Sequence, residues 1–346
     1  MHILVPGKIN ARSKMDKVNI QRLADELNLS IATVSRALRD SYQIRPETRQ
    51  KVWDLARKLN YQPNPFASGL REQKSKNIAV IFPELANNFF SQAINGIEQI
   101  ARQQGYQVLI YLTHESAASE IAFVNSLANG RADGLLISLS RETDNYDHIT
   151  ELNRKLPVIL FDRVCESSAM LNVTTDDYES SYKATRHLIQ RGCKRIMYLL
   201  ALKNLSAGRL RLQGYTDALA HANIPADKKL IIDCDENEKE NYRVIKEAVA
   251  AQNPDGILSS MEKLGTICYH VANDLELAVP QQLKIVSFSN LEIASLLHPS
   301  LTTVTQPAFD IGKEAANILF QLLDKKKIPP ENKIIQSILI ERASTS

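Results

Sequence analysis

From Asn77 onward the chain alternates short apolar runs with longer amphipathic segments. Eight runs have the length and the β-branched content of buried strands: 78–82, 108–112, 134–139, 158–161, 195–200, 230–232, 256–258 and 285–288. Six helical patterns lie among them: 92–104, 119–129, 179–191, 209–222, 242–252 and 263–275. Strands that alternate with helices pair in parallel, and the helices then cover both faces of the sheet. Because about 265 residues is long for one doubly wound sheet, the pattern predicts a two-lobed α/β body with parallel sheets.

The composition is that of an ordinary globular protein. Of 346 residues, 44% are apolar and 23% are charged. No apolar run approaches the roughly 18 residues that cross a bilayer, and the N-terminus lacks the apolar core of a secretory signal. The four cysteines are far apart and form no CxxC motif, which argues against a zinc site or a disulfide framework. We therefore expect a cytoplasmic protein without a membrane segment or a metal site.

Positive charge is concentrated near the N-terminus. Residues 1–76 contain 15 Lys and Arg against 7 Asp and Glu, which gives a net charge of +8. The rest of the chain contains 27 basic and 32 acidic residues, which gives −5. A basic head on a mildly acidic body indicates that the head meets a polyanion. A cationic tail without a specific target is the alternative, unless the head has a fold of its own.

The head has the pattern of a helix-turn-helix. An apolar stripe at helical spacing covers residues 20–27, with Asn19 before it as a cap. Asn28 tolerates the left-handed backbone that ends a helix, and Ser30 can cap a second helix. A third helical pattern covers residues 46–60. In a helix-turn-helix the second helix enters the major groove of DNA, with its N-terminal residues leading.

The outward face of the second helix carries the candidate DNA contacts. Arg36 can donate a pair of hydrogen bonds to guanine, and Ile31 and Ala32 can contact thymine methyl groups. Short hydroxyl side chains that suit phosphate oxygens occupy three further positions: Ser30, Thr33 and Ser35. The alternative is an amphipathic helical hairpin that binds no nucleic acid.

The motifs LA, LS-x-x-TVSR, PETR and LNY-x-PN, followed by a final Leu, extend through this head and the segment after it. With them the head resembles the headpiece of the LacI/GalR family of bacterial transcription regulators. The resemblance implies a helix-turn-helix domain over residues 15–61, preceded by a disordered extension over 1–14. It also implies a hinge helix or linker over 62–76, which in the family folds on specific DNA and inserts a leucine into the minor groove. The hinge residues expected to contact DNA are Asn64, Ala67 and Leu70. A plain flexible linker is the alternative.

The body, residues 77–343, resembles the periplasmic-binding-protein-like sensor of the same family. The matching pieces include IAVIFP, RADGLLIS, PVILFDR, SAGRLRLQGYTDAL and HPSLTTVTQP. In such folds a small molecule binds between the lobes, outside the carboxyl ends of the strands. The resemblance implies effector contacts at Phe89, Phe90, Asp162, Arg163, Arg211, Ser289 and Asn290. For each residue taken alone, a place in the core or in a lobe salt bridge is the alternative.

Two positions depart from the family pattern. Met261-Glu262 stands where the family often has Asn-Asp, and Ser287–Asn290 stands where it often has Gly-x-Asp. Both positions normally line the cleft, so we expect the effector to be recognised differently from the ligands of the best-known sugar and purine sensors. Phe, Asp and Arg side chains together still suit a polyol, because they combine an apolar face with hydrogen-bond acceptors and donors.

Motifs for catalysis are missing from the sequence. It contains no GxGxxG after the first strand, no GxxxxGK[ST], no GxSxG and no HExxH. The neighbouring carboxylates Asp176 and Asp177 fit a turn at a strand end better than a catalytic pair. We therefore expect neither enzyme activity nor a cofactor.

Together these features predict a sequence-specific DNA-binding transcription regulator, with repression favoured over activation. A small-molecule effector, expected to be a sugar or a sugar derivative, controls operator binding allosterically from the cleft. The expected partners are double-stranded operator DNA, this carbohydrate and a second copy of the chain, because a dimer reads a near-palindrome and the C-terminus lacks a leucine-heptad tail for tetramers. The alternatives are a ligand-binding protein with a decayed head and a sugar-active enzyme.

Overall fold

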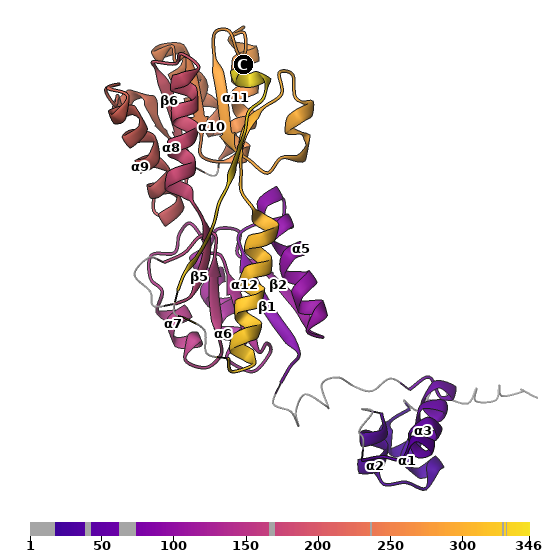
Figure 1. Ribbon diagram of the computed structural model, residues 1–346. Helices are drawn as coiled ribbons and strands as arrows, with labels where there is room; N and C mark the ends of the chain where they lie inside the picture. The colour runs from indigo at the N-terminus through magenta and orange to yellow at the C-terminus, as the bar shows by residue number, and fades with distance from the viewer. Residues whose placement is uncertain are drawn as a thin grey trace, which may run out of the picture. The chain divides into compact units, whose positions relative to one another are not determined.

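The described part of the head consists of three helices. In the computed structural model, residues 18–38, 43–61, 74–165, 170–235, 237–326, 329 and 331–346 are described. The chain divides into two units, residues 1–73 and 74–346. The described part of the first unit contains α1 (Ile20–Leu27), α2 (Ile31–Ala37) and α3 (Pro46–Lys58), so the predicted helix-turn-helix is confirmed (Figure 1). Its core consists of Leu23, Ala24, Val34, Ala37, Leu38, Val52 and Ala56.

The predicted N-terminal extension over 1–14 lies outside the described residues. The same holds for the predicted hinge, except for its last three residues, 74–76. The second unit begins there, at Lys74.

The first lobe of the second unit is built on a six-stranded sheet among the described residues, in the order β11-β5-β4-β3-β1-β2. The strands are β1 (Asn77–Phe82), β2 (Gln107–Leu112), β3 (Gly134–Ile137), β4 (Val158–Phe161), β5 (Asn172–Thr175) and β11 (Lys333–Ile335). The helices are α5 (Asn88–Gln103), α6 (Ala117–Leu127), α7 (Asp147–Asn153) and α12 (Ala308–Leu323). Helices α5 and α12 pack against each other on one face of the sheet, and α6 and α7 lie on the other (Figure 1).

The described part of the second lobe repeats this plan with the order β12-β10-β9-β8-β6-β7. The strands are β6 (Ile196–Leu200), β7 (Ile231–Asp233), β8 (Gly256–Ser259), β9 (Lys284–Phe288), β10 (Thr302–Thr305) and β12 (Ile338–Ile340). The helices are α8 (Asp177–Gln190), α9 (Ser206–His221), α10 (Glu238–Gln252) and α11 (Glu262–Asp274). Short 3-10 helices cover Lys228–Leu230, Glu292–Leu296 and Ala343–Thr345.

The central strands β1, β3 and β4 consist of apolar residues, except for Asn77 at the start of β1, and helices bury both of their faces. In β1, Ile78 and Val80 pack with the residues of α5 and α12, whereas Ala79 and Ile81 pack with those of α6 and α7. Side chains of a strand point alternately to the two faces of the sheet. A strand whose two faces are both apolar must therefore be covered by helices on each face. The described strands pair in parallel, apart from the antiparallel pair of β10 with β12. The predicted two-lobed body with parallel sheets is confirmed.

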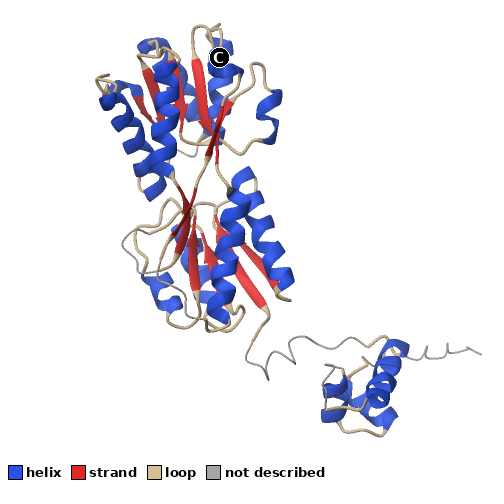
Figure 2. Ribbon diagram, viewed as in Figure 1, coloured by secondary structure: helices blue, strands red, loops and turns tan. Residues whose placement is uncertain are grey.

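The described chain passes from one lobe to the other between β5 and α8, between β10 and α12, and between β11 and β12 (Figure 2). Two of these crossings are joined side by side. The Ser337 N–H donates to Asp176 Oδ1 over 2.7 Å, and the hydroxyls of Thr175 and Ser337 are 2.5 Å apart. Asp176 precedes α8 as its cap residue and Asp177 starts the helix, which agrees with the predicted turn at a strand end.

Candidate functional site

Side-chain caps define the helix-turn-helix. Asn19 Oδ1 accepts a hydrogen bond from the N–H of Arg22 over 2.9 Å at the start of α1. Asn28 has the left-handed backbone, with φ of 51°, that ends this helix. Ser30 Oγ accepts from the N–H of Thr33 over 3.1 Å and caps α2. Each cap satisfies backbone N–H groups that an isolated helix end leaves unpaired, so the turn is set by local contacts.

One face of α2 is free for recognition within the head. Val34 and Ala37 are buried, whereas Ile31, Ala32 and Arg36 are exposed, with Ile31 43% accessible. The predicted hydroxyl residues lie beside this face: Ser30 is exposed, and Thr33 and Ser35 are half-buried. The remaining predicted DNA contacts, Asn64, Ala67 and Leu70, lie outside the described residues.

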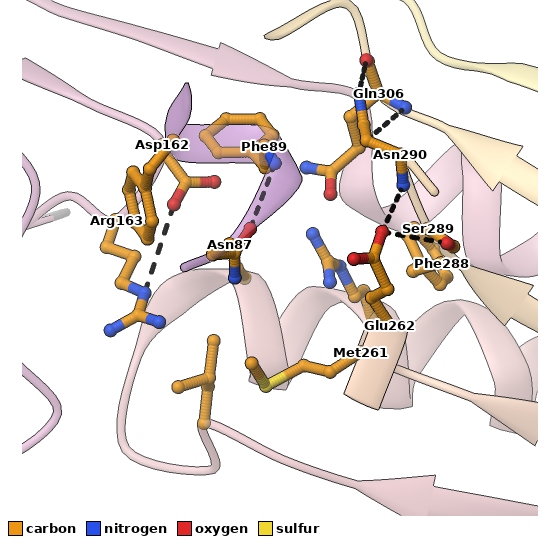
Figure 3. A pocket seen from close by; sticks show the side chains of 14 residues that line it. Asn87, Phe89, Asp162, Arg163, Met261, Glu262, Phe288, Ser289, Asn290 and Gln306 are labelled. Atoms are coloured by element: carbon orange, nitrogen blue, oxygen red, sulfur yellow. Dashed lines mark hydrogen bonds and ion pairs between the residues drawn. The ribbon is translucent and has the colours of Figure 1, made fainter. Parts of the chain in front are cut away.

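A second candidate site lies between the two lobes of the body. The cavity has a volume of about 460 Å³, which includes the solvent at its mouth. Its walls come from both lobes and from the β10–α12 crossing: Asn87, Phe89, Phe90, Asp162, Arg163, Leu202, Ala207, Arg211, Met261, Glu262, Phe288, Ser289, Asn290 and Gln306 (Figure 3). All seven residues predicted to contact an effector are among them. The carboxyl ends of β4, β8 and β9 lead directly into these walls, as expected for a parallel α/β fold.

Asp162 and Arg163 follow β4 at the first-lobe side of the cavity. Asp162 has a left-handed backbone, with φ of 60°, which an aspartate adopts more readily than most side chains. Burial raises the pKa of its carboxyl to about 6, although Arg163 and Arg211 act in the opposite direction. The Arg163 guanidinium donates from Nη1 to both carboxylate oxygens of Glu115 over 2.8 Å, and its Nε lies 3.9 Å from Asp162 Oδ2. Arg163 is thus held mainly by Glu115.

Arg211 is clamped on the second-lobe side. Its Nε donates to Asp177 Oδ1 over 2.7 Å, and its Nη1 donates to the carbonyl oxygen of Ser260 over 2.6 Å. The guanidinium lies 4.1 Å from the ring centre of Phe288, which is a cation–π contact. The approach of α9 to α8 that permits this pairing needs Gly214, since an added Cβ would lie 2.3 Å from the carbonyl oxygen of Tyr178.

Glu262, at the start of α11, is the most connected acceptor of the cavity. Its Oε1 accepts from Asn88 Nδ2 over 2.6 Å, and Asn88 belongs to the other lobe. Its Oε2 accepts from Ser289 Oγ and from the N–H of Asn290, each over 2.9 Å (Figure 3). Glu262 stands where the family often has Asp, and its carboxylate joins the two lobes.

Two buried donors of the cavity have no hydrogen-bond partner: Gln306 Nε2 and Arg163 Nε. The Gln306 residue is 8% accessible, and its backbone carbonyl oxygen accepts from Asn290 Nδ2 over 2.7 Å. Buried polar groups normally find a partner, so these two donors are available for further hydrogen bonds in the cavity.

The predicted aromatic residues differ in their surroundings. Phe90 is 1% accessible, and its ring packs against the rings of Phe82 and Phe161, so it belongs to the core as well as to the cavity wall. Phe89 is 7% accessible and meets Phe90 edge to face, with 5.4 Å between ring centres. Of the two, Phe89 is the better placed to contact a bound molecule (Figure 3).

Some wall residues were not among the predicted contacts: Asn87, Leu202, Ala207, Met261, Glu262, Phe288 and Gln306. Met261, Glu262 and Phe288 stand at the two positions where the sequence departs from the family pattern. Because the family uses both positions to line the cleft, these departures could have indicated the three residues as cavity residues. Gln306 and Leu202 carry no local signal, because only the packing of distant segments brings them to the cavity.

Among the described residues, no group of three or more His, Cys, Asp or Glu side chains is placed to hold a metal ion. No helix within the described ranges is long and apolar enough to cross a membrane.

Comparison with known proteins identifies both units. The family model "Bacterial regulatory proteins, lacI family" matches residues 19–64, and "Periplasmic binding proteins and sugar binding domain of LacI family" matches residues 75–343. Catabolite control protein A of Staphylococcus xylosus is 30% identical over 333 residues, which cover 95% of this chain and 99% of that protein.

Solved structures share the fold along the chain. The lac repressor dimer bound to operator and an anti-inducer has a TM-score of 0.85 at 22% identity, covering 95% of this chain and 99% of that one. The complex of the transcriptional regulator CelR with cellobiose has a TM-score of 0.72 at 23% identity, covering 95% and 100%. With a family model over most of its length and a relative that is 30% identical almost end to end, this chain belongs to the LacI family of bacterial regulatory proteins, in which a helix-turn-helix head is joined to a periplasmic-binding-protein-like body.

Proposed function

We propose that this protein is a transcription repressor that binds a near-palindromic operator as a homodimer and is controlled by a small carbohydrate in the cleft of its body. The observation that carries the proposal is the combination, in one chain, of an exposed recognition face on α2 and a polar cavity with unpaired buried donors. As a regulator of bacterial genes it acts in the cytoplasm, where the DNA lies.

In the head, Arg36 reads a guanine in each half-site through paired hydrogen bonds, while Ile31 and Ala32 contact thymine methyl groups. Hydroxyl side chains at three positions bind phosphates and orient the helix: Ser30, Thr33 and Ser35. The hinge contributes contacts from Asn64 and Ala67, and it inserts Leu70 into the minor groove. The absence of Asp and Glu from α2 supports this role, because no carboxylate of the helix opposes the phosphates.

In the body, the effector is held by Phe89, Phe90, Asp162, Arg163, Arg211, Ser289 and Asn290, and we add Glu262 and Gln306 to this set. Phe89 offers an apolar face, Asp162 accepts from hydroxyls, and Gln306 Nε2 can donate to a hydroxyl oxygen. Two structures of similar fold are complexes with a carbohydrate, cellobiose in one and ribose in the other, which supports a carbohydrate here. The lac repressor structure of similar fold is a dimer on an operator, which supports a dimer.

Control by the effector is allosteric if its affinity differs between the DNA-bound and the free protein. The crossings between the lobes are the segments that change when the cleft rearranges, and they connect the cavity wall at Gln306 to both sheets. A thermal-shift screen of sugars and nucleosides, repeated with operator DNA, tests this control, since a ligand stabilises the state that binds it. If no compound of the screen shifts the transition or changes DNA affinity, the effector role of the cleft is contradicted.

The DNA function is tested by binding of the full chain to duplexes from its own upstream region. Arg36→Ala is expected to weaken specific binding by about 1–3 kcal/mol per contact and to relax the preference at one base of each half-site. Arg57→Ala is the matched control, because Arg57 is an exposed arginine near the end of α3 and its loss removes the same charge. Affinity should fall steeply with salt for all variants.

A protein that binds all duplexes equally, and continues to do so after Arg36→Ala, does not have this function. Equal losses of specificity in the Arg36 and Arg57 variants would show that only charge is read.

A further inference from the structure

Three side-chain contacts join the lobes along one edge of the cavity. Asn88 Nδ2 donates to Glu262 Oε1 over 2.6 Å, Lys263 Nζ donates to Glu84 Oε2 over 2.6 Å, and Asn290 Nδ2 donates to Gln92 Oε1 over 3.0 Å. On the first lobe, Asn88 and Gln92 lie one turn apart in the first part of α5, and Glu84 lies in the loop that leads into this helix. We call these six residues the polar ladder: Glu84, Asn88, Gln92, Glu262, Lys263 and Asn290.

Glu262 is the middle rung of the ladder and reaches into the cavity. It bridges the lobes through Asn88 and binds its own lobe through Ser289 and the N–H of Asn290. All three donors that the described structure gives it are uncharged. No cationic side chain therefore offsets this carboxylate through a hydrogen bond at the cavity wall.

The cationic side chains of the cavity are already neutralised. Arg211 is paired with Asp177 over 2.7 Å, and Arg163 is paired with Glu115 over 2.8 Å. Both of these carboxylates lie outside the cavity wall. With Asp162 and Glu262 in the wall, four carboxylates face two guanidinium groups, so the cavity and its immediate support carry an excess of negative charge.

We propose that Glu262 closes the empty cleft and selects the charge of the effector, which must present a hydrogen-bond donor and no anionic group to this carboxylate. The closing role is inferred only from the contacts of the polar ladder, whereas the selecting role rests on the proposed effector function of the cleft. A hydroxyl or an ammonium group donates to the spare lone pair of Glu262 Oε1. Hydroxyl oxygens accept from Gln306 Nε2 and Arg163 Nε, which have no hydrogen-bond partner. A phosphate or carboxylate at the same place meets like charge in a poorly solvated site.

The closing role is tested without any ligand by exchanging the acceptor and the donor of the Asn88–Glu262 hydrogen bond. Asn88→Asp places two carboxylates face to face and should open the lobes. Adding Glu262→Gln should close them again, because the glutamine amide can donate to the new aspartate while its oxygen still accepts from Ser289 and Asn290. Asn95→Asp adds the same charge to an exposed position of α5 and is the matched control.

The distance between the lobes can be measured by pulsed electron paramagnetic resonance on the full-length protein. Spin labels on Ala122→Cys in α6 and Ala250→Cys in α10 report one lobe each, and the four native cysteines are buried. Mixing labelled chains with an excess of unlabelled chains restricts the signal to pairs within one protomer.

The expected result is a narrow distance distribution in the wild type and the control, a distribution several ångströms longer in the single variant, and recovery in the double variant. A wild-type distribution that matches the single variant would overturn the closing role, and so would failure of the double variant to recover.

The selecting role is tested by isothermal titration with matched probes: ribose against ribose 5-phosphate, and glucose against glucosamine and glucose 6-phosphate. Phosphorylated probes are added in competition with the parent sugar, so that binding to the basic head does not count. We expect the wild type to bind an uncharged or cationic sugar at least about tenfold more tightly than the phosphorylated form of the same sugar. Glu262→Gln, which keeps the shape and removes the charge, should narrow that ratio by about tenfold.

A wild type that prefers a phosphorylated probe overturns the selecting role, as does a ratio that Glu262→Gln leaves unchanged. A protein to which no probe of any charge binds contradicts the proposed effector function instead, and the distance measurement still decides the closing role.

Discussion

The residues proposed to contact DNA from α2 and its cap lie within Ser30–Arg36, whereas the wall of the cleft is drawn from positions between Asn87 and Gln306. Among the described residues of the head, side-chain hydrogen bonds join residues three or four positions apart, as in the cap of Ser30 on Thr33. In the cleft, Arg211 pairs with a residue 34 positions away, and Asn88 with one 174 positions away. The DNA-contacting surface of the head is therefore set by residues close together in the sequence, while the cleft is set by the packing of the two lobes.

The two regions also differ in how they use charge. The recognition face of α2 presents an exposed arginine that is available to a phosphate or a base. In the cleft, Arg163 and Arg211 are buried and paired with buried or half-buried carboxylates. The same residue type therefore binds an external polyanion in the head and organises an internal wall in the body. Substitutions in each region should separate these two roles.

Asp177→Asn should have the largest effect, and only on the body. The Asp177 and Arg211 side chains are 4% and 6% accessible, so loss of one charge leaves the other uncompensated in the interior. We expect the free energy of unfolding of the body to fall by about 3–5 kcal/mol. Urea denaturation followed by circular dichroism measures the change. Glu179→Gln removes an exposed acid from the same helical turn and should cost less than about 1 kcal/mol; equal losses in both variants contradict the importance of the buried pair.

Leu23→Ala should destabilise the head and leave the body intact. Leu23 is fully buried in the small core of the head, and such a truncation costs about 2–5 kcal/mol. Trp53 is the only tryptophan of the chain and lies in α3, so its fluorescence reports the head alone. We expect its transition to move to lower urea while the circular dichroism transition of the body stays in place. A matching shift of the body transition would show that the two units do not unfold independently.

Asp162→Asn should change the dependence of body stability on pH. Burial raises the folded pKa of Asp162 from 3.8 to about 6, so the folded protein binds this proton more tightly than the unfolded chain. Stability of the wild type therefore falls as the pH rises through this window, and the asparagine variant lacks that slope. Between pH 4 and pH 7 the variant should gain about 2–3 kcal/mol relative to the wild type. Thermal denaturation across this range measures the gain, and a constant difference between the two proteins contradicts it.

Ser30→Ala should have the smallest effect, confined to the head. It removes the side-chain acceptor for the N–H of Thr33 and should cost about 1 kcal/mol. Ser30→Asn retains an acceptor and serves as the control, with stability close to that of the wild type. Trp53 fluorescence in urea measures both variants. A loss in the asparagine variant as large as that in the alanine variant would show that the hydroxyl, and not the cap, is needed.

The elements with strong periodicity could be predicted from the sequence, and those without it could not. The strands around residues 78–82 and 158–161 are continuous apolar runs, and both are confirmed. Strands β5 and β10 were not predicted, because Asn172–Thr175 and Thr302–Thr305 are short and rich in polar residues. They form because the neighbouring strands of each sheet accept and donate their backbone hydrogen bonds. Helices α7 and α12 also lacked a predicted counterpart. For α12 this was an omission, because its buried residues follow helical spacing over Ala308–Leu323.

The candidate sites show the same limit. Asn19, Ser30 and Arg36 could be placed on helix ends and faces because helical periodicity and capping act within a few residues. The family pattern led to Asp162 and Arg211 as cavity residues. It could not indicate that Arg211 is already paired, because Asp177 reaches it only when α8 and α9 pack together.

By itself the sequence determined the helix-turn-helix, the alternation that builds two parallel lobes, and the separation of a basic head from an acidic body. These properties depend on periodicity, caps and composition, which act over short distances along the chain. Only the tertiary structure decided which charges of the cleft are neutralised, and that Glu262 meets Asn88 across the lobes. Pairing of buried charges depends on distances between side chains that are remote in sequence, and packing alone sets those distances.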